Sequence, residues 1–338
     1  MSSLTLEKVA ELAGVSRSTV SRVLNGQTGV KPGVRQRVWQ VIEETGYQPN
    51  MAARALASNR TGIIGLIIPH AVSTLFADPY FPRLIQGITQ VCNANDLSLT
   101  LFLFHSEDEE ANLTNRVLTA GFLDGVIMAS SHFNDPLIPA LVAYEMPLVV
   151  LGRQDRYPQI SFVDVDNLNG AYAATSHLLR IGYRRVAHIT GPLDVVAGLD
   201  RLAGYKKALA DKGRPVEPEL IAEGDFTEPG GYMAMQRLLA ARPDAVFAAS
   251  DLLAMGGWRA IREAGLDVPR DVALVGFDDL MPNAGRPRLT TIRQPVVRSG
   301  IEAVNVLLDV IANGTVPPRR VILDTQLVIR ESCGAISL

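Results

Sequence analysis

Two short amphipathic segments open the chain and meet at a tight turn. Their apolar side chains recur at helical spacing, at Leu6, Val9, Ala10, Ala13, Val20, Val23 and Leu24. Gly14 follows the first segment, where the left-handed backbone that ends a helix suits glycine. Ser16 is placed to cap the second segment through its hydroxyl. The pattern therefore predicts two helices joined by a short turn.

A third amphipathic segment and a shorter fourth one follow. Pro32 suits the first position of a helix that ends at Gly46. Pro49 then keeps the chain extended, and Asn50 can cap a helix over 51–57. Because seven residues are too few for a helix to be stable alone in water, we expect this last helix to form only when a partner orders it.

The pattern changes after Thr61. Continuous apolar runs, typical of strands buried on both faces, occupy 63–68, 97–104, 125–129, 147–151, 186–189, 245–248 and 272–276. Segments of helical period alternate with these runs, which predicts parallel sheets covered by helices on both sides. The alternation restarts near residue 162, so we expect two similar, doubly wound halves. A ligand in such a fold lies in the cleft at the carboxyl ends of the strands.

The charge distribution separates the first sixty residues, here called the head, from the remainder, here called the body. The 338-residue chain has a formal net charge of −3, yet the head carries eight Lys and Arg side chains against four Glu. The body is therefore strongly acidic. A small basic module on a large acidic one is suited to bind nucleic-acid phosphates through the module alone.

The remaining composition points to a cytoplasmic protein. No apolar run is long enough to span a membrane, and the N-terminus lacks the charged and apolar regions of a secretory signal. Cys92 and Cys333 are far apart and have no metal-ligand spacing. They are therefore predicted to be free thiols in a reducing compartment.

The second helix of the head exposes a polar face formed by Arg17, Ser18, Ser21 and Arg22. Arginines and small hydroxyls on a short helix are the side chains that read base edges in a DNA major groove. The residues of this helix alone leave a second interpretation open, in which the two helices are an ordinary core corner with a solvated arginine face.

Over essentially its whole length, the chain resembles the LacI/GalR family of bacterial transcription repressors. The resemblance rests on motifs in the head at 5–10, 13–16, 19–25, 46–50 and 52–56, and in the body at 191–192, 201–205, 250–251 and 275–279. It implies an all-α helix-turn-helix head with a hinge helix, followed by an α/β body of the periplasmic-binding-protein type. It also implies a homodimer whose heads read the two halves of a near-palindromic operator.

The same resemblance implies a domain organisation. The helix-turn-helix domain covers 1–49, the hinge helix and linker cover 50–60, and the effector-binding and dimerisation domain covers 61–338. Within this last domain, the resemblance implies an N-subdomain of about 61–162 and 291–320. The C-subdomain covers about 163–290 and 321–332.

By position, the resemblance assigns three groups of DNA contacts. The base-reading side chains are Arg17, Ser18 and Arg22. The phosphate and positioning contacts are Thr5, Ser16, Thr19, Ser21, Asn25 and Lys31. The minor-groove residues of the hinge helix are Asn50, Ala53 and Leu56, of which Leu56 enters between the central base pairs and kinks the DNA.

Lys31 departs from the family pattern. Family members usually carry Ser or Thr before the proline of the third helix, where the hydroxyl caps that helix and touches a phosphate. A lysine cannot accept the backbone N–H bonds of a cap, but it can reach a phosphate. We therefore expect the phosphate contact to be kept and the third helix to be less stable.

The resemblance also places a sugar-binding site in the cleft of the body. Its expected residues are Asp78, Tyr80, Phe81, Arg153, Asp164, Arg201, Phe226, Ser250, Asp251 and Asp278. Carboxylates and an arginine can hydrogen-bond sugar hydroxyls, while an aromatic ring covers the apolar face of the sugar. Asp78 and Asp251 are equally compatible with capping or structural roles, and Tyr80 and Phe81 with positions in the core.

The segments 77–81, 195–201, 223–227 and 247–251 look most similar to cellobiose-responsive repressors, which predicts cellobiose or another β-glucoside as effector. A maltose-type sugar, a monosaccharide, or a purine or other corepressor remain alternatives. A stand-alone sugar-binding transport protein is less compatible with the basic head. The sequence contains no Gly-x-Ser-x-Gly, His-Glu-x-x-His or Walker motif, so we expect no enzyme activity, no cofactor and no metal.

Overall fold

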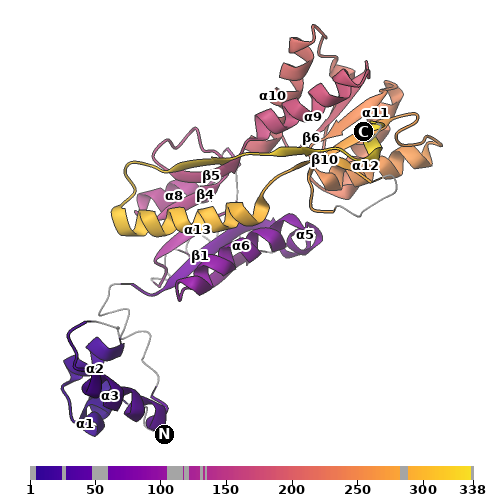
Figure 1. Cartoon of the computed structure of the whole chain (residues 1–338). Helices are drawn as coiled ribbons and strands as arrows, with labels where there is room; N and C mark the ends of the chain where they lie inside the picture. Colours follow the sequence, from indigo (N-terminus) through magenta and orange to yellow (C-terminus); the bar gives the residue numbers. More distant parts are fainter. Residues whose placement is uncertain are drawn as a thin grey trace. The chain divides into compact units, whose positions relative to one another are not determined.

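The computed structural model describes residues 5–24, 28–47, 60–104, 117, 122–129, 132–133, 135–281 and 288–335, with the backbone alone at 69–74 and 104. The chain divides into two compact units, Met1–Gly62 and Ile63–Leu338, which can be followed by colour in Figure 1. The predicted hinge helix, with Asn50, Ala53 and Leu56, lies outside the described residues, as does Asn25.

The described part of the first unit is a bundle of three helices, α1 (Leu6–Ala13), α2 (Arg17–Leu24) and α3 (Pro32–Thr45). Its core contains the apolar positions that the helical spacing predicted, together with an aromatic residue that follows α3. The buried side chains are Val9, Ala10, Ala13, Val20, Val23, Val38 and Tyr47. Gly14 and Gly46 end α1 and α3 with φ angles of 63° and 64°, a conformation that glycine adopts without steric cost.

The second unit contains two six-stranded sheets. The first has the order β11-β5-β4-β3-β1-β2, and every pairing in it is parallel. The apolar runs of β1, β3 and β4 are buried on both faces, as the uninterrupted hydrophobic pattern predicted, whereas Leu101 in the edge strand β2 is 41% exposed. The strands are β1 (Ile63–Ala71), β2 (Ser98–Phe104), β3 (Gly125–Met128), β4 (Leu148–Leu151), β5 (Ser161–Val165) and β11 (Arg320–Leu323).

The second sheet repeats this topology with the order β12-β10-β9-β8-β6-β7, in which only the pairing of β10 with β12 is antiparallel. In both sheets, the first strand along the chain (β1 or β6) pairs on one side with the next strand (β2 or β7). The following strand (β3 or β8) then pairs with its other side. This strand order creates a switch point at the carboxyl ends of the strands. The strands are β6 (Val186–Thr190), β7 (Ile221–Glu223), β8 (Ala245–Ala248), β9 (Ala273–Asp278), β10 (Thr290–Arg293) and β12 (Gln326–Val328).

Helices cover both faces of each sheet. One face of the first sheet packs on α6 (Tyr80–Ala94) and α13 (Val296–Asn313), and the other face packs on α8 (Leu137–Ala143). The second sheet lies between one helix pair on each face (Figure 1). These pairs are α9 (Asn167–Arg180) with α10 (Val196–Asp211), and α11 (Glu228–Ala240) with α12 (Asp251–Glu263). The remaining elements are α5 (Val72–Ala77), η1 (Pro218–Leu220) and η2 (Glu331–Cys333).

The predicted limits of the two subdomains are wrong by a few residues. Val163 pairs with Val321 in the first sheet, although both residues were assigned to the C-subdomain. Arg293 pairs with Asp278 in the second sheet, although it was assigned to the N-subdomain. The second sheet begins with β6 at Val186 and not near residue 162. Hydrophobic periodicity locates strands, but hydrogen-bond pairing decides which sheet each strand joins.

The structure therefore places three crossings between the subdomains directly after β5, β10 and β11. Figure 1 shows the last of these as the extended yellow stretch that runs from β11 in one sheet to β12 in the other. None of the helices in the described part of the chain combines the length and the apolar character needed to span a bilayer.

Candidate functional site

The turn between α1 and α2 has the predicted cap. The Ser16 hydroxyl oxygen accepts a hydrogen bond from the Thr19 backbone N–H at 3.2 Å and lies 2.8 Å from the hydroxyls of Ser18 and Thr19. The cap satisfies one of the backbone donors that a helix N-terminus leaves without partners. It fixes the direction in which α2 leaves the turn.

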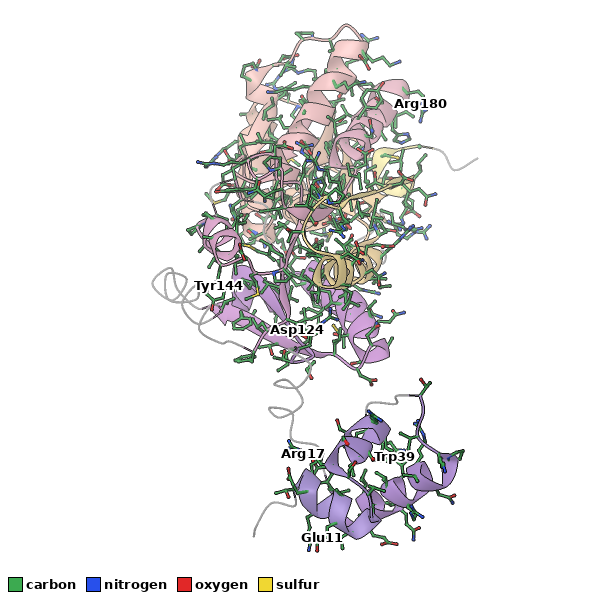
Figure 2. The ribbon with its side chains drawn as sticks, turned by 90° about the vertical axis from the view of Figure 1, so that its left-hand side faces the viewer. Glu11, Arg17, Trp39, Asp124, Tyr144 and Arg180 are labelled. Carbon is green, nitrogen blue, oxygen red and sulfur yellow. The ribbon has the colours of Figure 1, made fainter. Side chains whose placement is uncertain are left out.

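The outer face of α2 carries the predicted base-reading residues. Arg17, Ser18 and Arg22 are exposed, while Val20 and Val23 on the opposite face are fully buried. Figure 2 shows Arg17 on the surface of the three-helix bundle. Its Nε atom lies 3.2 Å from Oε1 of Glu7, and both side chains are mostly exposed. Because exposed ion pairs contribute little free energy, this pair can exchange readily for a contact with DNA.

The predicted phosphate contacts lie at the starts of the helices and along α2. Thr5 caps α1 by accepting from the Lys8 N–H at 3.4 Å. Lys31 precedes Pro32 at the start of α3 and makes no side-chain cap bond, as its chemistry predicted. Thr19 and Ser21 are half-buried on α2. The phosphate-binding role itself stays a prediction for all of them.

A cavity of about 610 Å³ lies between the two sheets at the carboxyl ends of their strands. Eight of the ten predicted effector residues line it, and two do not. The lining residues are Asp78, Tyr80, Phe81, Asp164, Arg201, Phe226, Ser250 and Asp278. A cavity of this size, with charged groups among apolar walls, is typical of small-molecule sites.

The first subdomain supplies an aromatic wall. Asp78 accepts a hydrogen bond from the Tyr80 N–H at 2.8 Å, so it stabilises the first turn of α6 and also faces the cavity. The Tyr80 and Phe81 rings pack edge to face with centroids 5.4 Å apart. Because Phe81 is only 6% exposed and Tyr80 is half-buried, each ring belongs partly to the core and partly to the cavity wall.

Asp164, near the end of β5, is a carboxylate held by several hydrogen bonds. It accepts hydrogen bonds from the N–H groups of Arg153 and Val165 at 2.9 and 2.7 Å, and from Asn167 Nδ2 at 3.0 Å. Burial nevertheless raises the pKa of Asp164 to about 6, against these bonds, which lower it. A carboxylate that titrates near neutral pH inside a cavity is a candidate ligand-binding group.

Arg201 extends from α10 as the central cation of the cavity and is only 5% exposed. Its Nε donates to Asn167 Oδ1 at 2.9 Å, and its Nη1 donates to the Ala249 carbonyl at 2.5 Å. The guanidinium carbon lies 3.6 Å from the centre of the Phe277 ring. The planar fork and the stacking together hold Arg201 in one orientation.

Asp278 completes this charge cluster at the end of β9. Its Oδ1 lies 3.9 Å from Arg201 Nη1 and accepts a hydrogen bond from Gln294 Nε2 at 2.5 Å. Burial raises the pKa of Asp278 well above its usual range, although Arg201 opposes the shift. Its backbone φ is 127°, a conformation that non-glycine residues rarely adopt outside functional sites.

Phe226 forms the aromatic wall on the second subdomain. Its backbone has a φ of 63°, and its ring centroid lies 5.7 Å from the Arg201 guanidinium carbon. The ring is half-buried at the cavity. It therefore offers a face on which an apolar ring surface can stack.

Arg153 and Asp251 do not line the cavity, so their contact with the effector stays a prediction that this geometry does not support. Asp251 is 3% exposed and accepts bonds from Thr291 Oγ1 at 2.6 Å and from the Leu280 N–H at 3.2 Å. Both its oxygens are thus used within the fold, as the structural alternative predicted. Ser250 combines two roles, since it lines the cavity and caps α12 by accepting from Leu253 N–H at 3.1 Å.

Two amide residues that line the cavity, Asn167 and Gln294, are not among the ten predicted effector residues. Both are uncharged amides on crossings between the subdomains, and they hydrogen-bond Arg201 and Asp278 respectively. Gln294 directly follows β10, so only a prediction of that strand could have pointed to it. That strand did not stand out in the hydrophobic pattern.

Comparison with known families finds two matches. Residues 5–50 match the model of the bacterial regulatory proteins of the lacI family, and residues 175–333 match that of the periplasmic binding protein-like domain. A curated relative, the HTH-type transcriptional regulator CelR of Thermobifida fusca, is 41% identical over 97% of this chain and 98% of its own length.

Two solved structures are similar over nearly the whole chain. The transcriptional regulator CelR–cellobiose complex has a TM-score of 0.78 and 39% identity, covering 97% of this chain and 99% of that one. The lac repressor dimer bound to operator and the anti-inducer ONPF has a TM-score of 0.85 and 29% identity, covering 98% and 99%.

Proposed function

Because the chain belongs to the LacI family of bacterial regulatory proteins, we propose that it represses genes of carbohydrate use. It binds a near-palindromic operator as a homodimer and leaves that operator when a small sugar enters the cavity. It acts by binding and not by catalysis, and it works in the cytoplasm, where operator DNA is found.

The observation that carries this proposal is the chemistry of the cavity. Asp164 and Asp278 supply hydroxyl acceptors, Arg201 supplies fixed donors, and Phe226 supplies a stacking face. This combination matches the alternating hydroxyl edges and apolar faces of a sugar ring. The walls come from both subdomains, so a bound sugar can bias how closely the two approach each other.

Cellobiose is the effector that the relatives favour. The CelR structure is a complex with cellobiose, and CelR is similar to this chain over nearly its whole length. We therefore propose that a disaccharide, cellobiose or another β-glucoside, occupies the cavity.

On the DNA, we propose that the exposed face of α2 reads the operator. Arg17, Ser18 and Arg22 contact base edges, where an arginine bound to guanine contributes about 1–3 kcal/mol of discrimination against other bases. Thr5, Ser16, Thr19, Ser21, Asn25 and Lys31 contact phosphates or position the head. Asn50, Ala53 and Leu56 bind the minor groove, where Leu56 kinks the duplex.

Sugar and operator are coupled through the two subdomains. When sugar closes the cavity, the first subdomains of the dimer change their contact, and the hinge helices separate from each other and from the DNA. Since such coupling is reciprocal, operator binding weakens sugar binding by the same factor.

A gel-shift titration of the full chain tests this function. The probe is a palindromic operator from the promoter of the protein's own gene, titrated with cellobiose, maltose, glucose and a purine base. We expect tight binding without ligand and release by cellobiose at lower concentration than by the other sugars. Failure to bind any specific site under all conditions would refute the repressor function.

The alternative is a corepressor-dependent regulator that senses a purine or another metabolite. In this chain, the Phe226 ring beside the Arg201 guanidinium suits a flat heterocycle as well as the apolar face of a sugar. The same titration separates the two functions, because a corepressor would strengthen the shift and cellobiose would leave it unchanged.

A further inference from the structure

An ion pair between Arg153 and Asp200 joins the two subdomains across the cleft. Arg153 Nη2, in the loop after β4, lies 3.1 Å from Asp200 Oδ1 on α10. The Asp200 side chain is only 15% exposed and that of Arg153 is 37% exposed. The pair is therefore partly withdrawn from water, where a charge pair is screened less than at an open surface.

Arg153 also makes two contacts within its own subdomain. Its Nε also lies 2.9 Å from Asp155 Oδ2, a carboxylate of the same subdomain that is 64% exposed. Its backbone N–H donates to Asp164, the carboxylate that faces the cavity. The side chain thus contacts carboxylates of both subdomains, while its own backbone supports one of the cavity walls.

A second set of contacts crosses the cleft at the loop between β6 and α10. The Phe133 N–H donates to the Asp194 carbonyl at 3.1 Å, and His132 Nδ1 lies 3.2 Å from Asp194 Oδ2. His132 also forms an isolated antiparallel bridge with Val195. Asp200 belongs to the helix that follows this loop, so both sets of contacts tie the same segment to the first subdomain.

The position of Asp200 beside Arg201 gives this segment a double role. Arg201 points into the cavity, whereas the neighbouring Asp200 points to the opposite subdomain. Any movement of α10 away from the first subdomain breaks the Arg153–Asp200 pair and moves the central cation of the cavity at the same time.

We propose that Arg153 and Asp200 form a clasp that holds the cleft closed and so sets the effector's affinity without touching the effector. Only the effect of the clasp on ligand affinity rests on the proposed sugar-binding function, because closure of the cleft does not itself require a ligand. Removing the clasp lowers the closed population, and the apparent affinity of a ligand falls in proportion to the loss of its binding-competent state. Arg153 and Asp200 are thus positioning residues.

Hydrogen exchange of the full-length dimer without sugar tests the clasp directly, because the Phe133 amide donates to the Asp194 carbonyl across the cleft and loses this bond when the cleft opens. We expect R153A and D200A each to speed exchange of the Phe133 amide by about three- to fivefold, the range expected for a partly exposed ion pair. The double variant R153A/D200A should exchange no faster than the faster single variant, because the two residues act as one unit.

D155A is the matched control. It removes the other carboxylate of Arg153, at a similar distance, but from the same subdomain. We expect D155A to leave Phe133 exchange unchanged. Unchanged exchange in both R153A and D200A, equal acceleration in D155A, or additive effects in the double variant would each overturn the clasp.

Calorimetric titration with cellobiose then measures the consequence. R153A should weaken cellobiose binding by up to the same three- to fivefold factor, while D155A should bind like the parent protein. Weakening by D155A equal to that by R153A would also overturn the clasp. A parent protein that binds no sugar would refute the proposed function instead, and the sugar-free exchange experiment would still decide the clasp.

Discussion

The ring of Phe226 fills the space beside Gly191 so completely that a Cβ added to this glycine would collide with the ring. Gly191 directly follows β6, and Phe226 follows β7, the neighbouring strand. The absence of a side chain at one position therefore allows the aromatic wall to lie at the other. This relationship gives a way to move the ring without removing it.

The G191A variant should weaken sugar binding by displacing Phe226. A stacking contact of an aromatic ring contributes about 1 kcal/mol, so we expect roughly a fivefold rise in Kd for cellobiose. Isothermal titration calorimetry measures this change. F226A is the reference, and G191A/F226A should be no worse than F226A alone, because both changes remove the same contact. Additive losses would show that Gly191 acts independently of the ring.

The R201K variant should lose the sugar response and keep DNA binding. Lysine retains the charge, but it loses the planar fork that bonds Asn167 and the Ala249 carbonyl and the stacking on Phe277. We expect a loss of about 2–3 kcal/mol in sugar binding, on the scale of hydrogen bonds to charged groups. Gel shifts with and without cellobiose check this, and normal release of the operator would remove Arg201 from the site.

Sugar affinity should depend on pH through Asp164. Burial raises its pKa to about 6, so the carboxylate is mostly ionised at pH 7 and mostly protonated at pH 5. If the ionised form accepts sugar hydroxyls, protons compete with the sugar, and affinity falls as pH drops through 6. We expect about a tenfold loss between pH 7 and pH 5. Calorimetry at both values tests this, and D164N should bind weakly and lose the change in affinity near pH 6.

Arg22 and Lys31 should differ in how they affect DNA binding. R22A removes a proposed base contact, so it should lower the preference for operator over random DNA by about 1–3 kcal/mol. K31A removes a proposed phosphate contact, so it should weaken binding to operator and to random DNA alike. It should also reduce the slope of log K against log salt concentration by about one. Anisotropy titrations at several salt concentrations separate the two. The assigned roles would be contradicted if K31A changed the preference for operator over random DNA and R22A changed only the salt dependence of log K.

The L56A variant should separate operator binding from sugar binding. Leu56 is proposed to enter between base pairs, an insertion that costs unstacking energy and is repaid by the wider contacts of bent DNA. Alanine is too short for this insertion. We expect operator affinity to fall at least tenfold, with cellobiose affinity in the absence of DNA unchanged. Equal loss of both would contradict the minor-groove role.

Local chemistry made the head predictable. The helical spacing of Val9, Val20 and Val23 identified the inner faces of α1 and α2, and the structure buries all three. Gly14 and Ser16 predicted the turn, since each acts through its own backbone or its nearest neighbours. Such features depend on residues a few positions apart, and they can therefore be read from one sequence.

The cavity was predictable only in part. Asp164 and Asp278 directly follow or end strands, and parallel strands bring their carboxyl ends to one edge of a sheet. Asp251 also follows a strand, yet it turns toward Thr291 in β10, two strands away in the sheet. Which way a carboxylate faces depends on partners that are far away in sequence, so its position along the chain did not distinguish a ligand residue from a structural one.

By itself, the sequence determined the kinds of elements, the family and the residue types that meet near the cleft, because periodicity, caps and motifs are local properties of the chain. Only the tertiary structure decided which sheet β5, β10 and β11 join, which predicted residues line the cavity, and that Arg153 pairs with Asp200 across the cleft. These outcomes depend on hydrogen bonds and ion pairs between distant segments. Their free energy is gained only after the fold has brought those segments together.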